Sequence, residues 1–133
     1  MQAMTAGVIY FAAVFAAGFV LGVLRTLMLL PHVGPMLAVM IELPLMLGWA
    51  WWVCARILRR LRLMRGEAVV MGAVAFALLM LGEAGISVWL AGRSLSQHLA
   101  LYGQAPHVLG LLGQLCFACF PWVQSRHGRT RAA

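Results

Sequence analysis

The stretch Arg56-Ile-Leu-Arg-Arg-Leu-Arg-Leu-Met-Arg65 decides how this chain folds, because its five arginines separate two long apolar segments. Two more apolar segments can be drawn in the rest of the chain, one before this pair and one after it. A membrane-spanning helix needs about 20 mostly apolar residues, and each segment comes close to that length. We therefore predict an all-α integral membrane bundle of four transmembrane helices, over Thr5–Leu30, Met36–Leu58, Ala68–Leu90 and His107–Val123.

The composition agrees with this class of protein. Of 133 residues, 64% are hydrophobic and 10% are charged, whereas soluble domains carry about 25% charged residues. An ordinary soluble domain is excluded, and we expect one transmembrane domain followed by a basic tail over residues 124–133. The net charge of +7 also suggests nucleic acid. Because the arginines flank apolar segments, however, membrane topology explains them and no nucleic-acid partner is predicted.

The distribution of arginine predicts an orientation, because cytoplasmic loops of membrane proteins are enriched in basic residues. The loop over residues 91–106 holds only Arg93, so we expect it outside, with both termini in the cytoplasm. Basic residues without lysine, together with abundant Ala, Gly and Leu, indicate a GC-rich bacterial genome and therefore a bacterial inner membrane. We expect the middle arginines to bind anionic lipid headgroups. The predicted cytoplasmic arginines are Arg56, Arg59, Arg60, Arg62, Arg65, Arg126, Arg129 and Arg131.

The two outer connections have different signatures. Pro31 and Pro35 predict a tight hairpin in which the first proline ends one helix and the second begins the next. Ser94-Leu-Ser-Gln97 has the form of a capping box, and Gly103 is a stop signal, so we predict a short interfacial helix in the third loop. Ser94 and His98 would share one helix face as a nucleophile and base, but capping explains Ser94 better, since no orienting acid stands beside them.

Four polar residues inside the predicted spans form the candidate site, because an intramembrane ionisable residue is a functional-site hypothesis by default. Counted at about 1.5 Å per residue, Arg25, Glu42, Glu83 and Gln114 lie roughly 7 to 11 Å below the outer helix ends. Arg25 and Glu42 sit on the two arms of the hairpin and are expected to pair. Glu83 would then be protonated, share Arg25, or hold a cation or proton.

Small residues and one tryptophan suggest how the helices pack. Gly18 and Gly22 form a GxxxG step just before Arg25, which predicts a face that approaches another helix closely, within the chain or between chains. Trp49 lies in the middle of its predicted helix, where we interpret it as a packing residue.

Three functions remain open from these residues. The first is an oligomeric transporter or channel for a small solute or protons, with Arg25, Glu42, Glu83 and Gln114 as ligands. The second is a non-catalytic subunit that stabilises a larger membrane complex, with the same residues as a static polar staple. The third is a lipid-acting intramembrane enzyme that uses Glu83, His98 or Arg93 near the outer headgroups. No catalytic residue, cofactor or metal site is assigned, and the expected partner is a second copy or another membrane subunit.

Three segments carry a resemblance: Gly18-Phe-Val-Leu-Gly22-Val-Leu-Arg25, Ile41-Glu-Leu-Pro44 and Gly92-Arg-Ser-Leu-Ser-Gln-His98. Together they resemble a group of short four-helix proteobacterial membrane proteins, over most of the chain, and this resemblance implies no activity. Fluoride channels also have glycines before an arginine, but the glycine register differs and their threonine-rich segment is absent. Small multidrug exporters rely on a carboxylate in the first helix, which this chain lacks.

Overall fold

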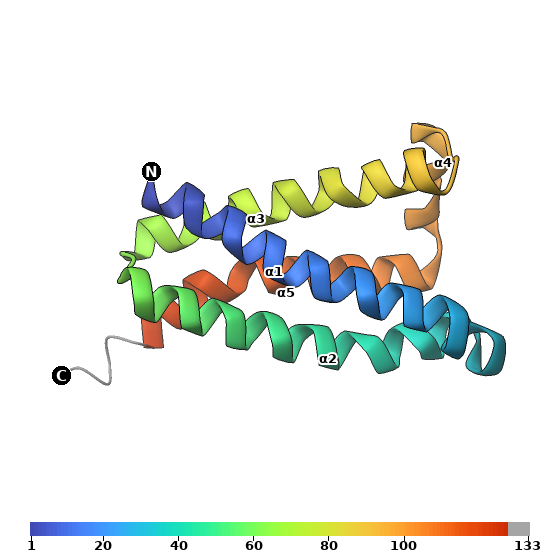
Figure 1. Cartoon of the computed structure of the whole chain (residues 1–133), viewed down its shortest axis with the longest axis horizontal. Helices are drawn as coiled ribbons and strands as arrows, with labels where there is room; N and C mark the ends of the chain where they lie inside the picture. The colour runs from blue at the N-terminus through green and yellow to red at the C-terminus, as the bar shows by residue number, and fades with distance from the viewer. Residues whose placement is uncertain (128–133) are drawn as a thin grey trace.

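The protein is an all-helical bundle. The structure is a computed structural model and describes residues 1–127, over which the chain forms helices and short turns without any strand. Three helical stretches are long and apolar enough to cross a membrane, namely Gln2–Leu61, Arg65–Leu90 and Ala105–His127. The first of these contains 60 residues and folds back on itself at Gly34, so that four helices make up the bundle (Figure 1).

The four long helices are extended by short segments of other helical types. Two π-helical segments, η1 and η2, continue α1 and α3, and a 3₁₀ turn, η3, follows the short helix α4. The elements are α1 (Gln2–Leu24), η1 (Arg25–Leu29), α2 (Leu30–Leu61), α3 (Arg65–Gly85), η2 (Ile86–Leu90), α4 (Leu95–Ala100), η3 (Leu101–Gly103) and α5 (Ala105–His127).

The turn between α1 and α2 differs from the predicted one. Pro31 does not end the first helix, because the chain stays helical through it and reverses at Gly34, where φ is 78°. Pro31 stands just after the π-helical segment η1, and the chain is helical on both sides of it. Glycine adopts a positive φ without the steric penalty of a Cβ atom. The prediction that Pro31 ends the first helix was therefore wrong, and Gly34 makes the turn.

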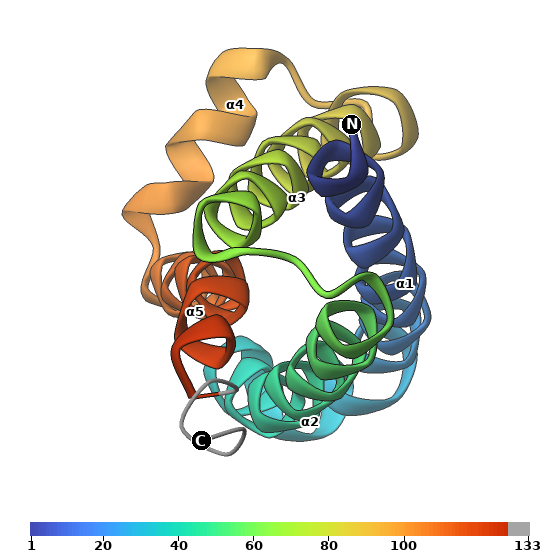
Figure 2. The same cartoon turned by 90° about the vertical axis from the view of Figure 1, so that its left-hand side faces the viewer.

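The helices surround a common axis in the order α1, α2, α5, α3. Each packs against its two neighbours in this ring, as Figure 2 shows along the axis. The α2–α3 turn, the start of α1 and the end of α5 lie at one end of the bundle, which we call the arginine end (Figure 1). The Gly34 turn and α4 lie at the opposite end, which we call the α4 end.

The packed core occupies the half of the bundle near the arginine end. Its largest fully buried side chains include Tyr10, Cys54 and Met71, and Phe117 is 3% exposed. The helices approach closely here, since a Cβ atom added at Gly72 would collide with the backbone oxygen of Ala118. The core is completed by Ala6, Val14, Ala50, Val53, Ile57, Ala75 and Leu79.

The short helix predicted in the third loop is present as α4. Ser94 Oγ accepts a hydrogen bond from the backbone N–H of Gln97 at 3.2 Å, and Gln97 Oε1 accepts one from the N–H of Ser94 at 2.9 Å. This reciprocal pair is the predicted capping box. Ser94 is therefore engaged in starting the helix, as expected, and its hydroxyl also lies 3.0 Å from that of Ser96.

Candidate functional site

A cavity of about 790 Å³ opens in the half of the bundle toward the α4 end. All four long helices and the α4 loop contribute to its wall, so it lies inside the ring of helices and not on one outer face. The six residues that the sequence singled out as ligand or outer-face candidates all line it. These residues are Arg25, Glu42, Glu83, Arg93, His98 and Gln114.

The expected ion pair between Arg25 and Glu42 is present. Arg25 Nη1 lies 2.9 Å from Glu42 Oε2, and the two side chains are 34% and 14% exposed. The Gly34 turn explains the pair, because it brings together two helices whose charged residues stand at similar distances before and after it in the chain. Arg25 is also the first residue of the π-helical segment η1, a type of irregularity that often marks functional sites.

Glu83 has a partner that the sequence did not reveal. Gln114 Nε2 on α5 donates a hydrogen bond to Glu83 Oε1 on α3 at 2.5 Å. The contact requires α3 and α5 to be neighbours in the ring, which the spacing of the two residues does not indicate. The other amide atom, Gln114 Oε1, is buried without a hydrogen-bond partner among residues 1–127.

The loop before and within α4 adds polar groups at the cavity mouth. Arg93 Nη1 lies 3.5 Å from the hydroxyl of the buried Ser87. His98 is 8% exposed, and its Nδ1 atom is buried with no partner within the described part of the chain. Its ring contacts Tyr102 edge-on, with centroids 5.7 Å apart. These residues had been expected only on the outer face, whereas the structure turns Arg93 and His98 toward the cavity.

Further polar residues that the sequence reasoning had not assigned to the site also line the cavity, namely Thr26, Ser87, Tyr102 and His107. Ser87 follows Glu83 by four residues, a spacing that puts both on one helix face and could have identified it. Tyr102, in the loop, lies within the electrostatic field of the site. Burial raises the pKa of its hydroxyl, and the negative charge of Glu83 raises it further.

The deeper wall of the cavity is apolar. It is formed by side chains that border the packed core, including Val14, Phe15, Leu79 and Phe117. Gly18 and Gly22 also line this wall, and nothing lies within 4 Å of where a Cβ atom at Gly22 would be. At Gly18, by contrast, a Cβ atom would lie 3.2 Å from the terminal methyl carbon of Met46 on α2, so the GxxxG face borders the cavity and packs tightly against a second helix at Gly18 alone. The cavity thus has a polar outer zone and an apolar inner zone.

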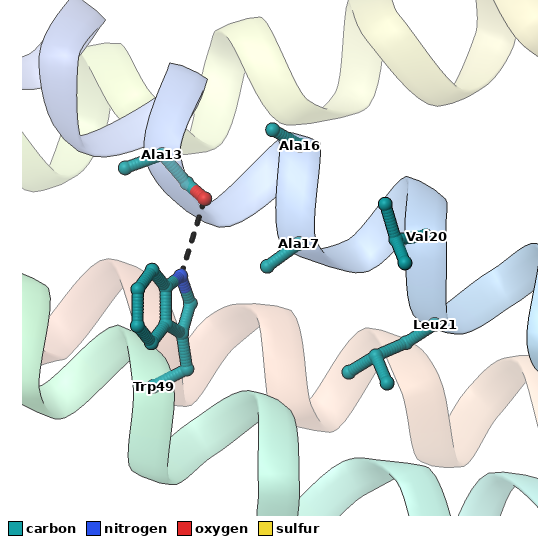
Figure 3. Close-up of a pocket in the computed structure, with 6 residues that line it drawn as sticks. All are labelled: Ala13, Ala16, Ala17, Val20, Leu21 and Trp49. Atoms are coloured by element: carbon teal, nitrogen blue, oxygen red, sulfur yellow. Dashed lines mark hydrogen bonds between the residues drawn. The ribbon is translucent and has the colours of Figure 1, made fainter.

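A second, smaller hollow lies between α1 and α2 and carries no polar cluster. Its wall is apolar, with a volume of about 520 Å³. In it, Trp49 Nε1 donates a hydrogen bond to the backbone oxygen of Ala13 at 3.2 Å (Figure 3). Trp49 thus ties α2 to α1, in agreement with its expected packing role. The remaining lining residues are Ala16, Ala17, Val20 and Leu21.

The predicted lipid-binding arginines lie at the arginine end, away from the cavity. Two of the basic side chains near this end contact tryptophan rings: Arg56 lies 5.4 Å from the ring centre of Trp52, and Arg126 lies 4.7 Å from that of Trp122. Tryptophan and arginine together are typical of membrane interfaces. Binding of headgroups by Arg56, Arg59, Arg60, Arg62 and Arg65 stays a prediction, and Arg129 and Arg131 lie outside the described residues.

Comparisons with known proteins add no functional assignment. No protein-family model matches the chain, and neither curated proteins nor solved structures give a significant match. The resemblance to short proteobacterial membrane proteins stays a prediction. Among residues 1–127, no group of three His, Cys, Asp or Glu side chains comes together that could hold a metal ion. The chemistry of the cavity must be inferred from its own residues.

Proposed function

We propose that this chain is a small transport protein that admits a solute or proton into its internal cavity. One observation carries the proposal: polar residues from all four helices meet on the wall of a single cavity. Charged groups inside a membrane are costly and are retained where they line a pathway or pair with each other. Arg25 and Glu42 are paired, whereas Glu83 has only an amide partner and is left facing the cavity.

The proposed location is a bacterial inner membrane with the arginine end in the cytoplasm. The positive-inside rule supports this orientation, because five arginines fall within residues 56–65 and the α4 loop contains only Arg93. Anionic lipids on the cytoplasmic side would bind the arginine cluster. In this orientation the polar zone of the cavity lies near the outer surface, and a solute enters from the periplasm.

The proposed working form is a homo-oligomer. The packed core closes the cavity toward the arginine end, so passage needs either helix movement or a route between subunits. Some small residues are already used within the chain: a Cβ atom at Gly72 would meet α5, and one at Gly82 would meet Phe15. Gly48 is exposed on α2, has no atom within 4 Å of an added Cβ atom and offers close contact to a second copy or another membrane subunit.

The test compares proton flux through liposomes that contain the wild-type chain or the variant Glu83→Gln. A pH-sensitive dye inside the vesicles reports flux after a pH gradient is imposed, between about pH 5 and pH 8, where most physiological proton switches operate. We expect wild-type flux above that of protein-free vesicles and loss of that excess in Glu83→Gln. Because no other solute is added, this experiment measures proton transport alone.

A matched control is Glu67→Gln, which makes the same chemical change outside the cavity. Glu67 Oε2 accepts a hydrogen bond from the N–H of Met64 at 2.8 Å and caps α3, a role that glutamine retains. The control should conduct like wild type. Equal flux in Glu83→Gln and wild type at every pH would remove Glu83 from the mechanism.

A further inference from the structure

The cavity contains two groups of opposite charge that pair neither with each other nor with any other ion. Arg25–Glu42 is the one ion pair among residues 1–127, and Glu67 caps α3. Arg93 therefore lines the cavity without a carboxylate, and Glu83 lines it without a cation. Both are left with a charge or hydrogen-bonding capacity that a ligand can satisfy.

Arg93 contacts Ser87 in η2, about one helical turn beyond Glu83. Arg93 Nη1 is 3.5 Å from Ser87 Oγ, and Ser87 follows Glu83 by four residues. Residues with this spacing have Cβ atoms about 5 to 6 Å apart. The cation is nearer the cavity mouth and the carboxylate is deeper. That separation leaves space for a ligand that presents an anionic group to Arg93 and a cationic group to Glu83.

Two buried polar atoms support a ligand at this level. Gln114 Oε1 is an acceptor with no donor, beside the amide nitrogen that bonds Glu83. His98 is more than nine-tenths buried, lines the same cavity, and has an unpartnered Nδ1. Buried polar groups are almost always hydrogen-bonded, so atoms left unpaired need an explanation such as a bound molecule. An ammonium group could donate to both Glu83 and Gln114 Oε1.

The apolar zone indicates what is attached to the charged groups. Below Glu83 and Gln114, one to two helical turns toward the arginine end, the wall is built from Leu79, Phe117 and Val14. A purely polar solute would leave this wall without a partner, whereas a hydrocarbon group fills it favourably. The volume of about 790 Å³ is ample for a small amphipathic molecule or for the headgroup and first carbons of a lipid.

We infer that the cavity binds a zwitterion with an apolar body, its anionic group at Arg93, its ammonium group at Glu83 and Gln114, and its hydrocarbon part against Leu79 and Phe117. This inference rests on the proposed binding role of the cavity and specifies the class of ligand. An apolar α-amino acid can present its groups in this order. A phospholipid with an ethanolamine headgroup is a second source of the same charges, but its phosphate lies between the ammonium group and the acyl chains, so it matches the charges and not the order.

The experiment measures equilibrium binding to the full-length purified chain in detergent, with probes that differ by one charge. The free probes are L-leucine, isocaproate, which lacks the ammonium group, and isoamylamine, which lacks the carboxylate. The lipid probes are phosphatidylethanolamine and phosphatidylglycerol, followed by native mass spectrometry. We expect one zwitterion to bind at least about tenfold more tightly than its single-charge analogues, since a buried charge left unpaired is costly.

Two variants should each weaken binding of the zwitterion but spare a different single-charge analogue. Arg93→Gln should weaken the zwitterion at least about tenfold and leave isoamylamine unchanged, while Glu83→Gln should weaken the zwitterion and leave isocaproate unchanged. Arg93→Lys should restore part of the affinity. Arg93 is in an exposed loop, so Arg93→Gln decides the matter even where Glu83→Gln does not fold.

Binding of L-leucine and of phosphatidylethanolamine distinguishes the two sources, because only the compound that occupies the cavity will lose affinity in the variants. Equal affinity for zwitterions and single-charge analogues would overturn the inference, and so would binding of neither zwitterion. A chain that passes protons in liposomes but binds neither zwitterion would leave the transport proposal standing. A chain that binds a zwitterion but passes no protons would contradict proton transport and retain the ligand class.

Discussion

The hydroxyl of Tyr10 on α1 donates a hydrogen bond of 2.9 Å to the backbone oxygen of Phe117 on α5. Pro121 stands four residues after Phe117 and has no N–H group, so the helix itself supplies no donor to that oxygen. Tyr10 is fully buried, and its ring stacks on that of Phe117 with centroids 4.3 Å apart. The tyrosine thus joins α1 to α5 across the bundle at a carbonyl that a proline has freed.

Replacing this tyrosine should destabilise the bundle through one hydrogen bond. We expect Tyr10→Phe to lower the free energy of unfolding by about 1 to 3 kcal/mol, because the Phe117 oxygen is left buried and unpaired. Unfolding in detergent, followed by circular dichroism, gives the value. In a Pro121→Ala background a helical N–H becomes available to that oxygen, so the cost of Tyr10→Phe should shrink. A cost that is the same in both backgrounds would contradict this account.

The Arg25–Glu42 ion pair should show energetic coupling. Either Arg25→Gln or Glu42→Gln should cost about 1 to 3 kcal/mol, less than for a fully buried pair because the arginine side chain is 34% exposed. The double variant should cost less than the sum of the two, since no charge is then left alone. A double-mutant cycle of unfolding free energies measures the coupling, and strict additivity would show that the pair contributes nothing.

The close approach of α3 and α5 depends on a glycine. Gly72→Ala should destabilise the bundle by about 1 to 3 kcal/mol, because its Cβ atom would overlap the backbone oxygen of Ala118. Gly110→Ala is the matched control, since nothing lies within 4 Å of its added Cβ atom. The control should be neutral or stabilising by up to about 1 kcal/mol from helix propensity. Thermal melts in detergent compare the two, and equal melting temperatures would argue against the tight contact.

The proposed orientation can be measured with single cysteines. After Cys54, Cys116 and Cys119 are replaced by alanine, Ser96→Cys in α4 and Gly66→Cys at the start of α3 supply one label site at each end of the bundle. A membrane-impermeant maleimide should label Ser96→Cys in intact spheroplasts and Gly66→Cys only after lysis, as the positive-inside rule requires. The reverse pattern would invert the orientation and turn the cavity mouth toward the cytoplasm.

Much of the architecture could be predicted from local sequence. Apolar segments of spanning length must form helices, because a lipid environment offers no other partner to backbone groups. The capping box of α4 is a contact over three residues, and it is present as predicted. The Arg25–Glu42 pair was also accessible, since a hairpin makes two consecutive helices neighbours whatever the rest of the fold does.

The turn between α1 and α2 was harder to predict from the sequence. The two prolines in this segment predict a turn at the prolines, whereas the chain reverses at Gly34. Its positive φ is a conformation that glycine adopts most easily. The sequence around Tyr10 likewise does not indicate that this side chain is fully buried and bonded to α5. Both cases depend on a contact or a backbone angle that residue type alone does not specify.

By itself, the sequence determined the number of long helices and the arginine end, and it singled out the four polar residues. The tertiary structure alone decided the cyclic order α1, α2, α5, α3, and with it the bond between Gln114 and Glu83 and the inward face of Gly18 and Gly22. The physical reason is that lipid tails are as apolar as leucine, so a membrane helix need not have a polar face. Helices that are apolar on all sides do not reveal which side is buried. That information resides in the packing of small residues and in the polar contacts between helices.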